Sequence, residues 1–155
     1  MKNILALLCT VIFLFSFGQK TMNPIEYKNS SEVFNIQGLS QSVSIDCGNS
    51  RMILLSGQVP LNAEGNLVGN TVEEQSHQIF RNIENILKEY GGTGKDIVKL
   101  GIFIKDISQT ASFRKVRDLY VNIQHPPVSS LVEVSSLFRN DVLIEVEATA
   151  VIKNK

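Results

Sequence analysis

The chain has 155 residues, which is enough for one compact domain of average size. Its hydrophobic fraction of 43% and charged fraction of 19% are ordinary for a soluble globular protein. Basic and acidic residues balance at 15 each. This balance argues against a nucleic-acid-binding surface, which usually carries a basic excess.

Residues 1–18 have the three-part layout of a secretory signal peptide. Lys2 precedes an apolar run from Ile4 to Phe17, and small residues at Ser16 and Gly18 suit cleavage after Gly18. The run is short for a membrane span. We therefore expect an exported protein, periplasmic or secreted, with no membrane-bound part after cleavage. A retained membrane anchor and a lipoprotein modified at Cys9 are the alternatives.

Two segments follow the predicted signal peptide. Residues 19–36 are expected to form a polar leader with a candidate first strand at Glu32–Gln37, and residues 37–155 are expected to form the folded domain. Cleavage would leave Cys47 as the only cysteine, so no internal disulfide is expected.

A hairpin is predicted at the start of this domain. Residues 41–47 alternate polar and apolar side chains, which places Val43, Ile45 and Cys47 on the inward face of a strand. The apolar run Met52–Leu55 supplies the second strand after a Gly-Asn-Ser turn.

Two helices alternate with the remaining strands. Thr71 and Glu74 have capping-box spacing, which predicts the start of the first helix. Ser108 or Ser112 is expected to cap the second helix, which carries apolar residues at helical spacing as far as Ile123. Further strands are predicted at residues 97–104, 129–134 and 142–152. The order β-β-α-β-α-β-β indicates an α+β fold with both helices on one face of the sheet.

The predicted strands supply apolar residues to both faces of the sheet. Two helices cover only one face, so the other is expected to be buried against further copies of the chain. The residues concerned include Met52, Leu54, Leu100, Ile102, Leu131 and Leu143.

Five segments in order resemble the RidA family, also called YjgF or reactive intermediate deaminases. The resemblance covers residues 37–153, and it rests on the combination of segments rather than on any single one. The segments are Ser56–Pro60, Gln75–Gln78 with Asn82, Asp96–Lys99 with Phe103–Asp106, Val132–Val134, and Ile144–Ala148.

The resemblance implies a fold similar to chorismate mutase and a homotrimer that binds small molecules in clefts between subunits. It implies hydrolysis of 2-imino or enamine acids to 2-oxo acids and ammonia, without a cofactor. Some members of the family carry an older endoribonuclease L-PSP label.

The resemblance also places site residues on this chain. Glu145 matches the residue thought to orient the attacking water, and the backbone of Ser56 and Gly57 is retained. Phe103 is a further candidate in the cleft, although a place in the core is the favoured interpretation. Leu39 stands where the family has a cleft tyrosine.

Three further cleft positions depart from the pattern of the deaminating members. Ser129 stands at the position of an arginine that grips the substrate carboxylate, and Leu131 at that of a cysteine. Arg117 stands at the position of an asparagine, where it could grip a carboxylate or simply face solvent. The expected 2-imino acid deaminase activity is therefore weakened.

Two functions remain open. The first is binding or hydrolysis of a small imine-like molecule, with Glu145 holding water and Ser129 donating a hydrogen bond. The second is a non-catalytic trimer that binds a ligand or another protein. A ribonuclease is disfavoured because there is no basic excess and neither His77 nor His125 has a partner histidine at a readable spacing. Metal binding is also disfavoured, because no cluster of Cys, His and Asp has the spacing of metal ligands.

Overall fold

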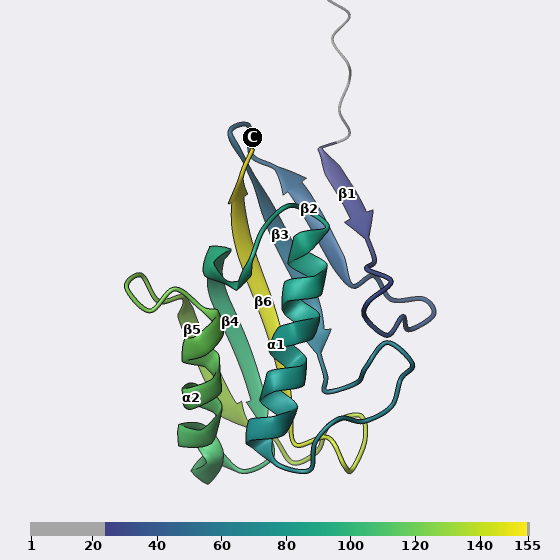
Figure 1. Cartoon of the computed structure of the whole chain (residues 1–155), viewed down its shortest axis with the longest axis vertical. Coiled ribbons are helices and arrows are strands. Elements are labelled where there is room, and N and C mark those ends of the chain that lie inside the picture. The colour runs from purple at the N-terminus through teal and green to yellow at the C-terminus, as the bar shows by residue number, and fades with distance from the viewer. Residues whose placement is uncertain (1–23, 155) are drawn as a thin grey trace, which may run out of the picture.

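A computed structural model describes residues 24–154 of the chain, and its arrangement is shown in Figure 1. The predicted signal peptide, residues 1–18, and the first part of the leader lie outside the described residues. No helix within residues 24–154 is long and apolar enough to cross a membrane.

Strands and helices alternate along the described chain much as the sequence predicts. The strands are β1 (Ile25–Lys28), β2 (Ser42–Asp46), β3 (Ser50–Gln58), β4 (Ile97–Ile104), β5 (Val128–Glu133) and β6 (Ile144–Lys153). The α-helices are α1 (Val72–Lys88) and α2 (Thr110–Tyr120), and short 3₁₀ turns cover Gly94–Asp96 and Ile107–Gln109.

These strands form one sheet in the order β1-β2-β3-β6-β4-β5. Neighbouring strands are antiparallel except for the parallel pair of β4 and β5. Both α-helices lie on the same face of the sheet (Figure 1). The predicted α+β fold is confirmed.

The core lies between α1 and the sheet. Thr71 caps α1 as predicted: its hydroxyl accepts from the backbone N–H of Glu74, and the Glu74 carboxylate accepts from the N–H of Thr71, both at 3.2 Å. The predicted inward positions of α1 are fully buried, and they pack with the helix-facing side chains of β3, β4 and β6. The buried helix positions are Ile79, Ile83, Ile86 and Leu87.

The first strand differs from the prediction. Residues 32–37 form no strand, and β1 instead lies within the predicted leader. Tyr27 of β1 pairs with Val43 of β2, so β1 is held by a partner strand that its own sequence does not reveal. Residues 32–37 instead belong to a loop in which the carbonyls of Val33 and Phe34 accept hydrogen bonds from the buried Gln41 side chain.

The orientation of β2 is also opposite to the prediction. Ser42 and Ser44 are buried on the helix-facing side, Val43 and Ile45 lie on the other face, and Cys47 is exposed beyond the strand end. The Ser42 hydroxyl lies 2.9 Å from both the Lys28 carbonyl and the Tyr90 hydroxyl, so its burial leaves no polar group unpaired.

The second helix begins without either predicted serine cap. Asp106 accepts a hydrogen bond from the N–H of Ser108 and starts the 3₁₀ turn that leads into α2. The residue that precedes α2, Gln109, makes no side-chain capping bond. The helix ends at Tyr120, so Ile123 lies beyond it and is 66% exposed.

The face of the sheet away from the helices, called the open face below, carries many partly exposed apolar side chains. They are Val43, Ile45, Met52, Leu54, Phe103, Val128, Val132 and Val151. An apolar surface that spans a whole sheet is typical of an interface.

Candidate functional site

A bulge in β3 brings two of the predicted site residues together. The pairing of β3 with β6 shifts register between Leu55 and Gln58, which displaces Ser56 and Gly57 from the regular ladder. The Glu145 carboxylate of β6 lies against Gly57, since a Cβ atom there would overlap its Oε1. Glycine is therefore required at position 57 for the carboxylate to occupy this place.

Glu145 lies on the open face in a row of side chains. Phe103 pairs in register with Glu145 on one side and with Val132 on the other. This register places the Phe103 side chain beside Glu145 on the open face, and Phe103 does not belong to the helix-facing core as the sequence had favoured.

Burial raises the pKa of Glu145, and the negative charge of Glu147 raises it further. No hydrogen bond or ion pair of the Glu145 side chain is seen among residues 24–154. A carboxylate without a partner, held next to a glycine backbone and an aromatic ring, is suited to hold a water molecule or a ligand nitrogen.

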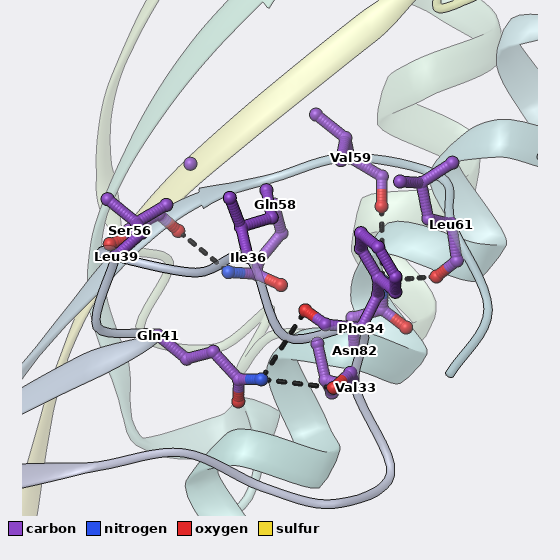
Figure 2. Close-up of a pocket in the computed structure, with 11 residues that line it drawn as sticks. Val33, Phe34, Ile36, Leu39, Gln41, Ser56, Gln58, Val59, Leu61 and Asn82 are labelled. Carbon is purple, nitrogen blue, oxygen red and sulfur yellow. Dashed lines mark hydrogen bonds between the residues drawn. The ribbon is translucent and has the colours of Figure 1, made fainter. Parts of the chain in front are cut away.

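Gly57 also contributes to the lining of a small pocket of about 30 Å³ that is partly open to solvent. Leu39, Ser56 and Gly57 line it, as expected for members of one site (Figure 2). The Ser56 hydroxyl donates to the Ser40 carbonyl at 2.6 Å and so is occupied within the wall.

Most of the other residues that line this pocket were not predicted. Val33, Phe34 and Ile36 come from the loop that was predicted as a strand, and Val59 and Leu61 follow β3. Apolar residues at positions 33, 34, 36 and 39 were the available signal, but a short apolar segment of this kind is also compatible with a strand.

Two buried amides hold the walls of the pocket, as Figure 2 shows. The Gln41 Nε2 donates to the carbonyls of Val33 and Phe34 at 3.0 and 3.5 Å. The Asn82 Nδ2, from α1, donates to the carbonyls of Val59 and Leu61 at 3.1 and 3.0 Å. Both side chains thus fix loops whose backbone would otherwise carry unpaired polar groups.

The remaining predicted site residues lie elsewhere on the protomer. Ser129 and Leu131 pair in register with Leu100 and Ile102, on the helix-facing side of the edge strand β5. Arg117, on α2, donates from Nε and Nη2 to its neighbour Asp118 at 2.8 and 2.7 Å. One protomer therefore carries the predicted site as two separate groups.

The two groups are too far apart for one small ligand to touch both. Strands β3 and β5 are separated by β6 and β4, so three strand spacings, about 14 Å, lie between Gly57 and Ser129. Within residues 24–154, no three His, Cys, Asp or Glu side chains are grouped as metal ligands.

The family model described as Endoribonuclease L-PSP matches residues 31–152. The chain belongs to this family. Its members include the RidA, YjgF and RutC proteins, and it is a family of small-molecule-binding imine deaminases.

Individual relatives extend the family match. A RutC family protein of Pyrococcus abyssi is 37% identical over 110 residues, which is 70% of this chain and 84% of the relative. The mitochondrial protein Mmf1 of Saccharomyces cerevisiae is 31% identical over 137 residues, which is 88% of this chain and 89% of the relative. The crystal structure of RidA from the Antarctic bacterium Psychrobacter sp. superposes with a TM-score of 0.70 at 25% identity, over 82% of this chain and 99% of that chain.

Proposed function

We propose that this L-PSP family protein is a homotrimer that binds or hydrolyses a small imine-like molecule in clefts between subunits. The observation that carries the proposal is the partnerless Glu145 carboxylate, which lies against the backbone of Gly57. No cofactor is proposed, because addition of water to an imine requires only a group that moves protons.

Assembly from several subunits is supported by the geometry of the two residue groups. Ser129 lies about 14 Å from Gly57 within one protomer, so a small ligand at Gly57 is reached by Ser129 only from a neighbouring copy. The apolar open face and the exposed edge strand β5 supply surfaces for such a neighbour.

The reaction follows from what Glu145 offers. A water molecule held by the carboxylate adds to the imine carbon, and the C=N electron pair moves to nitrogen. The proton that water loses passes through Glu145 to that nitrogen and gives a carbinolamine. The proton of its hydroxyl group then moves to the same nitrogen, the C=O bond forms, and the C–N bond breaks to release ammonia. The balance is R₂C=NH + H₂O → R₂C=O + NH₃. A carboxyl group whose pKa is raised by burial is suited to accept and return this proton.

Ser129 weakens this activity toward 2-imino acids. A serine cannot form the two parallel charged hydrogen bonds with which an arginine holds a carboxylate. The missing contact costs about 2–5 kcal/mol, or about 30- to several-thousand-fold in rate. The chain is accordingly proposed to be an arginine-lacking member of the family.

The proposal is tested by assaying hydrolysis of 2-iminobutyrate, generated in the assay mixture, with a protein that consists of residues 19–155. We expect slow turnover that is lost in Glu145→Gln and increased at least tenfold in Ser129→Arg. Glu89→Gln, a change at an exposed carboxylate that lines no part of the pocket, serves as the control. Turnover that is equal in Glu145→Gln and the wild type would contradict a catalytic role.

A non-catalytic ligand-binding or protein-interaction trimer is the second candidate. It is favoured by the pairing of Arg117 with Asp118, which leaves that guanidinium already engaged. In that case wild type and Ser129→Arg both lack turnover, and Glu145→Gln binds its ligand normally.

We further propose that the protein is exported through cleavage after Gly18. The support is the pattern of Lys2 followed by the apolar run from Ile4 to Phe17. N-terminal sequencing of the protein recovered from cells should start at Gln19. A mature protein that still starts at Met1 would contradict this proposal.

A further inference from the structure

Charged side chains on the open face are separated by sign along the strands. Among the strand residues that the structure describes, this face carries Glu145 and Glu147 near the start of β6, Lys153 at its end, and Lys99 near the start of β4. Because β4 and β6 are antiparallel, both lysines lie towards the same end of the sheet. The face therefore has an acidic part and a basic part within an otherwise uncharged surface.

A hollow of about 230 Å³ on the open face is lined by one charge of each sign. Lys99 and Glu147 both line it, together with Leu54, Gly101 and Thr149 among others. Lys99 pairs in register with Thr149 and Glu147 with Gly101, so the two charged residues are diagonal neighbours on adjacent strands. The hollow lies over β3, β6 and β4, which are inner strands of the sheet.

The two charges of the hollow are not paired within the protomer. No ion pair or hydrogen bond of the Lys99 or Glu147 side chain is seen among residues 24–154, and both residues are exposed. The Glu147 carboxylate lies over the backbone of Gly101, where a Cβ atom would overlap its Oε1. In an isolated protomer, water therefore solvates both charged groups.

A second copy that covers the open face removes this water. An unpaired charge inside an apolar interface is strongly unfavourable, whereas an opposite charge in contact with it compensates for the lost hydration. A copy that presents the same open face brings a lysine and a carboxylate of its own. Registers that place like charges together, or leave each charge alone, are disfavoured, and a register with lysine against carboxylate is favoured.

We propose that Lys99 of one copy forms an ion pair with Glu147 of a neighbouring copy, and that this pair sets the register in which open faces assemble. The inference rests on the proposed function, since it requires copies of the chain to cover the open face. A second copy suits this surface because it supplies both the complementary charge and a matching apolar area. Apolar side chains such as Leu54 provide the affinity, and the ion pair excludes other registers.

Charge reversal tests the ion pair in sedimentation experiments on residues 19–155. Lys99→Glu and Glu147→Lys should each raise the concentration at which the oligomer dissociates at least tenfold, and the variant that carries both changes should return to within about threefold of the wild type. The two single variants, mixed in equal amounts, should recover part of the assembly, because each then meets the opposite charge on its neighbour. Lys88→Glu, an exposed reversal at the end of α1, should leave assembly unchanged.

Neutral variants repeat the test without adding like charges, which protects it against a reversal that prevents folding. Lys99→Met and Glu147→Gln should each weaken assembly, and the double variant should be no weaker than either single one. Reversals that lower the urea midpoint but leave sedimentation unchanged would place the pair within one protomer and overturn the inference. An oligomer that Leu54→Lys dissociates and both reversals leave intact would also overturn it, without contradicting the proposed trimer. A monomeric wild type would overturn both.

Discussion

Replacement of Gln41 by leucine should open the loop that forms one wall of the pocket. Gln41 is 5% exposed, and its Oε1 accepts from the buried N–H of Ser30 at 2.8 Å while its Nε2 donates to the Val33 carbonyl at 3.0 Å. Longer contacts from the same Nε2 reach the carbonyls of Ser30 and Phe34 at 3.3 and 3.5 Å. One side chain thus holds the backbone at both ends of residues 30–34.

The cost of the change follows from these contacts. Leucine has a similar volume, so the loss is confined to hydrogen bonds, of which two are short. Each contributes about 1 kcal/mol, and leaving the buried N–H of Ser30 without a partner costs about 1–3 kcal/mol more. Burial of the apolar leucine side chain offsets part of this loss. The loop is then destabilised by about 2–4 kcal/mol, which makes its opening about 30- to 1,000-fold more frequent.

Amide hydrogen exchange measures this opening directly. The N–H groups of Val33 and Leu39 are bonded within the loop, to the carbonyls of Ser30 and Ile36, and both should exchange faster by the same factor in Gln41→Leu. Gln37→Leu makes the same chemical change at an exposed position of the loop and should leave exchange unchanged. Exchange accelerated less than threefold in Gln41→Leu would show that the amide does not anchor the loop.

Three further predictions concern the carboxylate, the open face and the helix cap. Burial raises the pKa of Glu145 above its unfolded value, so its ionised form disfavours folding at neutral pH and this penalty fades as pH falls through the folded pKa. Glu145→Gln should therefore raise the urea midpoint at pH 7 but not at pH 4; a lower midpoint at pH 7 would contradict this. Leu54→Lys, on the open face, should reduce the oligomer to smaller species in sedimentation experiments, whereas Leu119→Lys on α2 should not; an unchanged oligomer in Leu54→Lys would exclude the open face as interface. Thr71→Ala should cost about 1 kcal/mol in urea unfolding, and Thr71→Ser much less; equal losses would rule out the hydroxyl cap.

Elements fixed by short-range signals were predictable from the sequence. The start of α1 depends on Thr71 and Glu74, which are three residues apart, and its buried face follows from helical spacing. Strands β4 and β6 are long and apolar enough to identify without knowledge of their partners. The layering of helices on one face then follows from the order of elements.

Elements that depend on distant partners were not predictable. β1 is a four-residue strand whose pairing with β2 cannot be inferred from its own pattern. In β2, the apolar alternation indicates one face, but Ser42 is buried on the other because the Tyr90 hydroxyl and the Lys28 carbonyl satisfy it. A sheet that is apolar on both faces removes the usual rule for deciding which face turns inward.

The candidate site shows the same division between local and distant information. Leu39, Ser56, Gly57 and Glu145 were assigned by resemblance. In the structure the first three line one pocket, and the Glu145 carboxylate lies against Gly57 without lining that pocket. The register shift in β3 that aligns Gly57 with Glu145 depends on pairing between strands distant in sequence, and it leaves no trace in spacing.

A half-buried, unpaired Glu145 carboxylate costs free energy of folding, and it depends on the local backbone of β3 for its place. An ordinary side chain at position 57 would displace the carboxylate, and a cation nearby would pair with it and remove its capacity to hold a ligand. The glycine, the bulge and the flanking Phe103 together maintain an environment that is unfavourable for folding but useful for a reacting carboxyl group. Glu145→Gln removes the half-buried charge, so it should raise the stability of the fold and weaken ligand binding at the same time. Measuring the urea midpoint and ligand binding of this one variant therefore tests the site jointly.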